Sequence, residues 1–260
     1  MSPRTWTRIV LAIALCRAFA CSGQSAPAAP DTRVPILVEL FTSEGCSDCP
    51  PADKLLAQLD ATQPIPGARA IVLEEHVTYW DRQGWRDPFS LDEVTDRQQQ
   101  YQFRFQLQDV FTPQMVVDGA VQFVGNNPGA LGKALTTAAT TPKQPLTIDN
   151  AHWQNGAAEF TVHSPTPSGS RLVAVLAADA AHTDVLHGEN AGHTLQHIAV
   201  LRVIKEFKPD EANGHPLRLP GGSLDHGNEA TGPVRLIVFL VDHKTGHVLA
   251  VAEQTLTRTA

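Results

Sequence analysis

The hydrophobic pattern of the first half of the chain alternates between strand-like and helix-like segments. Ile36–Phe41 and Ala68–Glu75 are short apolar runs of the length that a buried strand needs. Between them, Leu55, Leu56 and Leu59 share one face of a helix. A strand, a helix and a second strand in this order predict a parallel βαβ unit.

A second helix is predicted after this unit. Ser90 and Glu93 have the spacing of a capping box, in which the two side chains bond the backbone at a helix start. The residues that follow carry an apolar stripe of helical period. That stripe consists of Leu91, Val94, Tyr101 and Phe105.

A hairpin and a third helix complete the first half. Asp118–Gly119 is a strong two-residue turn signal between the apolar runs Gln114–Val117 and Ala120–Val124. The last helix is expected to begin at Asn127 or Pro128.

The second half has a different pattern. Its apolar runs are short, and no segment of helix length has a clear amphipathic pattern. The expected strands are Leu146–Asn150, Ala158–His163, Arg171–Ala178, Thr194–Ile204, Val234–Asp242 and His247–Leu256. A low-complexity stretch at residues 136–145 predicts a linker between the two halves. Many short strands after a linker predict an antiparallel β-sandwich.

A Cys-x-x-Cys pair, Cys46 and Cys49, lies between the first strand and the first helix. The start of a helix stabilises a thiolate, which is the reactive form of cysteine. We therefore expect Cys46 to attack and Cys49 to resolve the mixed disulfide. Asp48 opposes thiolate formation and is a good N-cap, so the helix is expected to begin near it.

The order of elements behind this pair predicts an α/β thioredoxin-like domain followed by an all-β antiparallel sandwich domain. The expected boundaries are a signal peptide at 1–20, a flexible tether at 21–33, the first domain at 34–141 and the sandwich at 145–260. In this arrangement Thr112–Pro113 opens the hairpin opposite the cysteines and positions a substrate backbone. Tyr79 and Trp80 are candidates for a peptide-binding wall or for simple loop packing.

The N-terminus has the features of an export signal. Arg4 and Arg8 precede the apolar run Ile9–Leu15, which is too short to span a bilayer, and small residues follow. Cleavage before Cys21 would make that residue a candidate for lipidation. We expect an exported protein, periplasmic or anchored on the extracytoplasmic side of the membrane.

Composition narrows the class of partner. The formal net charge is -7 and no basic stripe is present, which argues against nucleic acid. Ten of the eleven histidines lie beyond residue 150, in spacings that match no standard metal motif, and are expected on the surface. No hydrolase motif is present, and no cofactor is expected.

Four motifs resemble a family of exported bacterial proteins of unknown function that carry a thioredoxin-like domain. They are VELFTSEGCSDCPPAD, HVTYWDRQGWRDPF, TPQMVVDG and GENAGHTLQHIAV, and the resemblance runs from about Val34 to the end of the chain. It implies a thioredoxin-like fold with its Cys-x-x-Cys at Cys46 and Cys49, but no established substrate. Thr78 stands where an acidic residue is common in that family.

Three functions stay open on these residues. The favoured one is thiol–disulfide exchange on other exported proteins that carry thiols or disulfides, which would make the protein a thiol–disulfide oxidoreductase. A second is a binding module in which the disulfide is a structural staple. A third is a copper or zinc site formed by Cys46, Cys49 and His76. Glu39 and Glu44 are candidate proton carriers or solvated surface groups.

Overall fold

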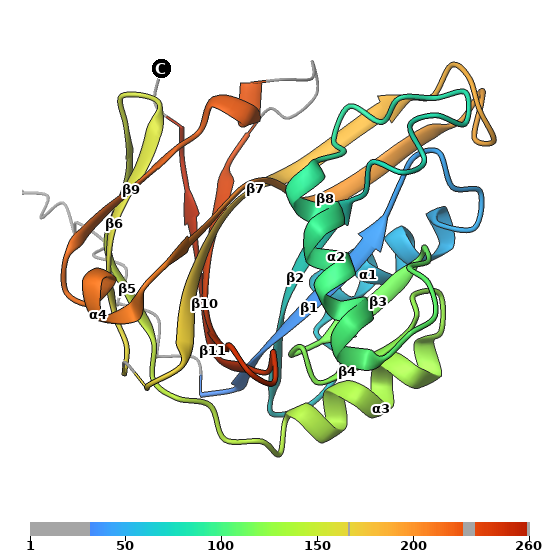
Figure 1. Cartoon of the computed structure of the whole chain (residues 1–260). Coiled ribbons are helices and arrows are strands. Elements are labelled where there is room, and N and C mark those ends of the chain that lie inside the picture. The colour runs from blue at the N-terminus through green and yellow to red at the C-terminus, as the bar shows by residue number, and fades with distance from the viewer. Residues whose placement is uncertain (1–31, 166, 226–231, 259–260) are drawn as a thin grey trace, which may run out of the picture. The chain divides into compact units, whose positions relative to one another are not determined.

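The computed structural model describes residues 32–165, 167–225 and 232–258 (Figure 1). The described chain from Thr32 onward belongs to one compact unit. The expected signal peptide, Cys21 and most of the expected tether lie outside the described residues.

Eleven strands, four α-helices and one 3₁₀ helix make up the described chain. The strands are β1 (Val34–Thr42), β2 (Ala68–His76), β3 (Gln114–Val117), β4 (Val121–Val124), β5 (Thr147–Gln154), β6 (Ala157–His163), β7 (Ser170–Asp184), β8 (Thr194–Phe207), β9 (Pro216–Pro220), β10 (Val234–Asp242) and β11 (Val248–Leu256). The helices are α1 (Pro50–Thr62), α2 (Asp92–Phe105), α3 (Pro128–Ala138), α4 (Pro209–Ala212) and the 3₁₀ helix η1 (Gly222–Asp225).

Eight of these strands form one mixed sheet in the order β11-β10-β7-β8-β2-β1-β3-β4. β1 and β2 are parallel, as the βαβ pattern predicts, and β3 pairs with β1 in the antiparallel direction. The early and late strands meet where β8 runs parallel to β2, with Val200 opposite Glu74. The other three strands form a separate antiparallel sheet in the order β5-β6-β9.

This sheet overturns the expected fold class. An α/β thioredoxin-like domain followed by an all-β antiparallel sandwich domain would keep a separate sheet in each half of the chain. Instead, β7, β8, β10 and β11 continue the sheet that β1 to β4 begin. The expected strands are all present, but the apolar pattern of a strand shows which face is buried and not which strand pairs with its edge. The outer edge of β2 offers unpaired N–H and C=O groups, and β8 occupies it.

The large sheet curls so that its late strands lie against early elements (Figure 1). The N–H of Val248, at the start of β11, donates to the carbonyl oxygen of Asp118 in the β3–β4 turn at 2.8 Å. Arg235 of β10 binds Asp60 of α1 at 2.8 Å. The late strands β10 and β11 are therefore bound to α1 and to the β3–β4 turn.

The side chains of β1 alternate between two apolar cores. Ile36, Val38 and Leu40 pack with α1 and α3 on one face of the sheet. Leu37 and Phe41 face the other way, into a core shared with α2 and with the inner faces of β7 and β10. A third core lies between the large sheet and the three-stranded sheet. This placement fixes the end of β1, and the cysteine turn that follows it, against buried structure on both faces.

The expected capping box of the second helix is wrong. Leu91 is the N-cap of α2, and there is no side-chain cap hydrogen bond. The hydroxyl of Ser90 donates to Asp81 at 2.8 Å instead. The helix itself and its apolar stripe are confirmed, with Val94 and Tyr101 fully buried.

The hairpin turn and the third helix are confirmed. Asp118 and Gly119 have φ values of 52° and 62°, which is the left-handed backbone that a tight hairpin needs. Asn127 caps α3, since its side-chain oxygen accepts from the N–H of Ala130 at 3.0 Å.

Candidate functional site

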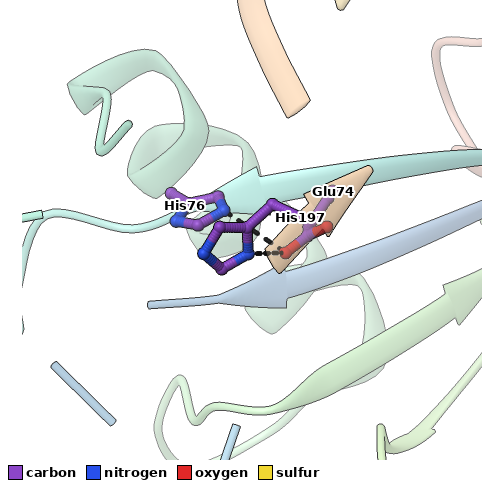
Figure 2. Close-up of side chains that lie close together, drawn as sticks. All are labelled: Glu74, His76 and His197. Carbon is purple, nitrogen blue, oxygen red and sulfur yellow. Dashed lines mark hydrogen bonds and ion pairs between the residues drawn. The ribbon is translucent and has the colours of Figure 1, made fainter. Parts of the chain in front are cut away.

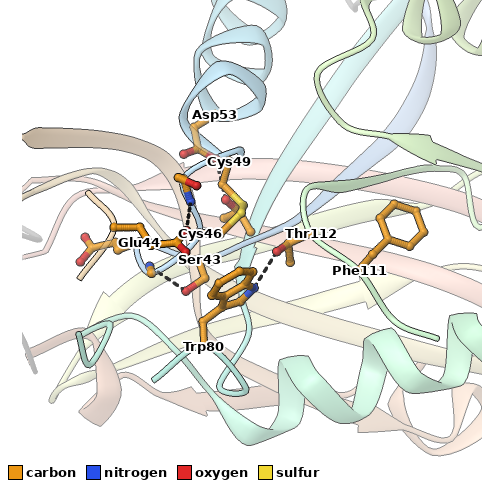
Figure 3. The surroundings of a disulfide bond; sticks show 12 residues. Ser43, Glu44, Cys46, Cys49, Asp53, Trp80, Phe111 and Thr112 are labelled. Carbon is orange, nitrogen blue, oxygen red and sulfur yellow. Dashed lines mark hydrogen bonds between the residues drawn. A yellow bond between two sulfur atoms is a disulfide. The ribbon is translucent and has the colours of Figure 1, made fainter. Parts of the chain in front are cut away.

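Cys46 and Cys49 are joined by a disulfide at the start of α1 (Figure 3). Their Cα atoms are 5.4 Å apart, and Cys49 is the N-cap residue of the helix. The N–H of Cys49 donates to the carbonyl oxygen of Cys46 at 3.2 Å, so the turn between the cysteines is closed by the backbone as well. The predicted meeting of the two sulfurs at a helix mouth is therefore present.

The helix begins one residue later than expected. Asp48 is exposed and Cys49 is the N-cap, so the prediction that Asp48 caps the helix is wrong. Pro50 and Pro51 occupy the first turn, as predicted, because a proline costs no hydrogen bond there. These prolines also remove two N–H groups that could face a thiolate, which weakens the stabilisation that the helix start offers.

Both cysteines are enclosed. The exposed fraction is 1% for Cys46 and 0% for Cys49. Residues 185–193, the loop between β7 and β8, which we call the β7–β8 loop, are hydrogen-bonded to the cysteine turn. The side-chain amide of Asn190 donates to the carbonyl oxygens of Glu44 at 2.8 Å and of Cys46 at 3.0 Å. The carboxylate of Glu189 accepts from the N–H of Ser47 at 3.1 Å.

Trp80 and Thr112 form a wall beside the disulfide (Figure 3). The indole N–H of Trp80 donates to the hydroxyl of Thr112 at 2.8 Å. The Thr112–Pro113 bond is cis. A Cβ atom at Gly125 would lie 3.1 Å from the Cβ of Pro113 and 3.2 Å from that of Ala52, which places Pro113 against the first turn of α1. Tyr79 is half-buried and lines a polar surface depression beyond the wall.

Asp53 is a buried carboxyl group one helical turn after Cys49, in the surroundings of the disulfide (Figure 3). It accepts a hydrogen bond from the hydroxyl of Thr42 at 2.7 Å. Burial, and then the charge of Glu74, raise the pKa of Asp53 to about 7. Asp53 also lines a cavity of about 610 Å³ between α1 and the start of β8. It is therefore a group that can hold or release a proton near neutral pH.

Below the cysteine turn lies a buried cluster of two histidines and three carboxylates, which we call the histidine cluster. Its members are Glu44, Glu74, His76, Asp87 and His197. His76 bonds Asp87 through Nδ1 at 2.7 Å, and His197 bonds Glu74 through Nδ1 at 2.5 Å (Figure 2). The other nitrogen of His197 lies 3.3 Å from an oxygen of Glu44.

Mutual attraction in this cluster outweighs the cost of burying charge. Burial by itself lowers the pKa of His76, but the charge and hydrogen bond of Asp87 raise that pKa to about 9. Burial likewise opposes the charge on Glu74, yet the charge of His197 lowers the pKa of Glu74 to about 2. The charge of Glu74 holds the pKa of His197 well above its usual range. These groups are thus charged at neutral pH in this structure.

Glu39, one of the two candidate proton carriers from the sequence, lies outside the histidine cluster. Glu39 and Glu44 are both fully buried, so neither is a solvated surface group. Glu39 accepts from the guanidinium of Arg97 at 2.7 Å and from the hydroxyl of Tyr101 at 2.6 Å. It belongs to a separate buried ion pair beneath α2.

Sequence reasoning did not find Asp53, Glu74, Asn190 or His197. One signal was available for Asp53, which shares its helix face with Leu56 and Leu59 and is therefore expected to be buried. His197 was expected on the surface with the other late histidines, and its burial corrects that expectation. Its position in an apolar strand was the only clue, and its partner comes from a strand 123 positions away.

The comparisons with known proteins give a family and a fold. The chain belongs to the family described as "Protein of unknown function (DUF1223)", whose pattern matches residues 37–226. An X-ray structure of a protein from Agrobacterium tumefaciens is similar, with a TM-score of 0.61 and 20% identity, over 86% of this chain and 94% of that one. No curated protein matches. The described chain, moreover, contains no helix with the length and apolar character needed to cross a membrane.

Proposed function

We propose that this protein exchanges disulfides with other exported proteins through Cys46 and Cys49. The observation that carries the proposal is the disulfide at the mouth of α1. Two sulfurs three positions apart can close on each other and reopen without moving the strands or the helix that hold them. The assigned roles are nucleophile for Cys46 and resolving thiol for Cys49.

The exchange is reversible and needs no further reactant. A thiolate of a client dithiol attacks the Sγ of Cys46, which forms a bond between client and Cys46 and breaks the Cys46–Cys49 bond. Cys49 leaves with the electron pair and takes a proton. The client's second thiolate then attacks the client sulfur of the mixed disulfide and releases Cys46. The client is oxidised to a disulfide and the protein is reduced to a dithiol; the reverse order reduces a client disulfide.

Asp53 is the group that we assign to the proton of Cys49. It lies one turn along the same helix, and its pKa of about 7 allows it to give up or accept a proton near neutral pH. The cavity beside it links this carboxyl group to solvent. Asp53 thus acts on the pair as a proton carrier and not as a nucleophile.

Exchange requires that the β7–β8 loop moves away from Cys46. The loop is held by the hydrogen bonds of Asn190 and Glu189 to the cysteine turn, and its exposed residues flank those contacts. A client that replaces these bonds with its own backbone would open the loop at little net cost. Trp80 and Thr112 then form the wall against which the client lies.

A structural disulfide in a binding module is the second candidate, and the burial of both sulfurs favours it. In that case the pair stays oxidised and only fixes the turn before α1. The two candidates differ in one property: whether the Cys46 sulfur reacts in the folded protein.

The test compares Cys49→Ser, which leaves Cys46 as a free thiol, with Cys46→Ser. Each variant of the full chain reacts with an aromatic disulfide reagent in native buffer and in denaturant. Exchange predicts that Cys46 reacts in native buffer much faster than Cys49 does, and that the wild type accelerates the reduction of insulin by dithiothreitol. Equal reaction of both thiols, in denaturant only, would establish the structural disulfide instead.

The remaining parts of the proposal concern location. We infer export from the N-terminal pattern, and attachment to the extracytoplasmic face of the membrane if Cys21 is lipidated. Mass spectrometry of the mature N-terminus tests both. An unmodified start at or after residue 21 excludes the lipid, and an intact residue 1 in the producing cell excludes cleavage.

A further inference from the structure

A cavity of about 430 Å³ lies between the β3–β4 hairpin, α3 and the start of β11. Its volume is within the range of small-molecule binding sites. It shares no lining residue with the cysteine turn, the histidine cluster or the β7–β8 loop, so the proposed disulfide exchange does not use it. Many of the side chains around it are apolar, and they include Val117, Val121, Phe123, Ala134, Ala138 and Val248.

Small side chains on α3 leave this space open. Ala130, Ala134 and Ala138 follow one another at four-residue intervals, so they lie on one face of the helix, and all three line the cavity. Val121, on the edge strand β4, lines it from the hairpin and is 41% exposed. Valine is usually buried, and a ligand between β4 and α3 would remove this apolar surface from water.

The walls of the cavity are held in place by two turns that pack against each other. A Cβ atom at Gly119 would clash with the carbonyl oxygen of Gly246, so the β3–β4 turn lies directly against the β10–β11 turn. The N–H of Val248 donates to the carbonyl oxygen of Asp118, and the N–H of Asp118 donates to that of Leu37, each at 2.8 Å. A site that is already ordered binds a ligand at a smaller entropic cost.

The charged groups of the lining leave an excess of positive charge. Lys133 of α3 is exposed and has no ion-pair partner in the part of the chain that the structure describes. The only carboxylate among the described lining residues is Asp118. Asp118 is already paired with Lys143 at 2.8 Å, and it accepts from the N–H of Leu37 at 3.0 Å. His247 adds a group that becomes positive at mildly acidic pH.

Lys143 brings an ammonium group to the same cavity, although its side chain is only 6% exposed. An ammonium group has three N–H donors. Two of them are used by Oδ2 of Asp118 and by the carbonyl oxygen of Val248, each at 2.8 Å. The third is left for a ligand. A carboxylate suits this position because it accepts a charge-assisted hydrogen bond and is attracted by Lys133 as well.

We propose that this cavity binds an amphipathic carboxylate, a small molecule with an apolar chain and one negative charge, such as a fatty acid of medium length. The chain would lie between Val121 and the alanines of α3, and the carboxylate at Lys143 and Lys133. A cationic head group would meet two ammonium groups and a carboxylate that is already neutralised. The proposal is independent of the cysteine pair and of the exchange assigned to it.

The first experiment titrates the wild-type full chain with octanoate and decanoate in a calorimeter, below the concentrations at which they aggregate. We expect saturable binding at one site. Decanoate should bind roughly 15-fold more tightly, because each additional buried CH₂ increases affinity about fourfold. Decyltrimethylammonium has the same chain with a positive head group and should bind at least tenfold more weakly than decanoate. No saturable binding of decanoate at millimolar concentration, or equal binding of the cation, would overturn the proposal.

A pair of variants on α3 tests the place of binding. Thr137 is exposed and lines the cavity, whereas its neighbour Thr136 is exposed and does not. Both positions accept a large side chain without disturbing the core. Thr137→Trp should fill the cavity and weaken decanoate binding at least tenfold, and Thr136→Trp should bind like the wild type. Unchanged affinity in Thr137→Trp, or an equal loss in both variants, would contradict the assigned site.

A second pair of variants tests the charge. Lys133→Glu should weaken decanoate binding about three- to tenfold and leave the binding of octanol, which has no charge, unchanged. Lys244→Glu, on the exposed β10–β11 turn outside the lining, is the matched control and should leave both ligands unaffected. An equal loss of decanoate and octanol in Lys133→Glu would show that the lysine does not recognise a carboxylate, and it would overturn the ligand class.

Discussion

The side-chain amide of Asn190 donates to the backbone carbonyl oxygen of Cys46 at 3.0 Å, although 144 positions separate the two residues. It also donates to the carbonyl oxygen of Glu44 at 2.8 Å. One side chain from the second half of the chain therefore closes the cysteine turn of the first half. We expect the accessibility of the disulfide to depend on this contact.

Replacing Asn190 with Ala should expose the disulfide. Two buried carbonyl oxygens would lose a partner, which costs about 1–3 kcal/mol. Because 1.4 kcal/mol corresponds to about a factor of ten, reduction by dithiothreitol in native buffer should become roughly tenfold faster. The measurement is the rate of thiol appearance after quenching. Asn126→Ala, at an exposed turn, is the control and should change little. Unchanged reduction in Asn190→Ala would show that the loop does not limit access.

Asp53→Asn should change how stability depends on pH. The folded pKa of Asp53 is about 7, above its ordinary value of 3.8, mainly because of burial and then the charge of Glu74; His197 and His76 act in the opposite direction. Protonated Asp53 therefore stabilises the fold below pH 4, and that contribution is lost as the pH rises toward 7 and above. The variant cannot ionise, so it should gain on the order of 1–4 kcal/mol relative to the wild type between pH 4 and 8.

Urea unfolding at several pH values, in buffer with a chelator, measures this difference. Asp48→Asn removes an exposed carboxyl group close to the same disulfide and should show no such trend. If the stability of Asp53→Asn follows the wild-type pH profile, Asp53 does not titrate near neutral pH in the folded protein, and its assignment as proton carrier is wrong.

Gly125→Ala should destabilise the contact between the hairpin and α1. An added Cβ would lie 2.8 Å from Cδ1 of Leu40 and 3.1 Å from Cβ of Pro113, and all of these atoms are packed in the core. Overpacking of this kind costs about 1–3 kcal/mol. The control is Gly132→Ala in α3, where nothing lies within 4 Å. That change should instead stabilise the protein by about 0.5–1 kcal/mol, because alanine favours a helix. Thermal unfolding followed by circular dichroism distinguishes the two, and equal shifts would contradict the packing.

Arg235→Met should weaken the attachment of the late strands to α1. Arg235 donates to Asp60 at 2.8 Å and to Asp179 at 2.6 Å, and it is largely buried. Removing one partner of a buried network leaves its carboxylates uncompensated, which costs about 3–5 kcal/mol when burial is complete and about 2–4 kcal/mol here. Arg171→Met breaks a more exposed pair with Glu206 and should cost under about 1 kcal/mol. Denaturant unfolding measures both, and a smaller loss in Arg235→Met than in Arg171→Met would refute this ranking.

The elements of this fold were predictable because their signals are local. The apolar run Ile36–Phe41, the turn at Asp118–Gly119 and the cap at Asn127 each depend on neighbouring residues only, and all three are present. The capping box at Ser90 failed for a tertiary reason, since its hydroxyl finds a stronger partner in Asp81. Local patterns thus give the elements and some of their ends.

The arrangement of the strands was not predictable in the same way. In the pairing of β2 with β8, Glu74 lies opposite Val200. The sequence pattern of neither strand indicates that it pairs with the other. The histidine cluster depends on that pairing, because it brings His197 beside Glu74. A site formed by a long-range strand contact stays hidden until the topology is known, whereas the Cys46–Cys49 pair is visible from spacing alone.

The loop that encloses the disulfide has a consequence for biosynthesis. The ribosome makes Cys46 and Cys49 well before Asn190, the residue that later seals them. During that interval the nascent thiols face the surrounding medium and can meet an oxidant or an isomerase. Once the second half has been completed and has folded back, Asn190 closes the cysteine turn, so we expect the pair to be most open to an oxidant before folding is complete.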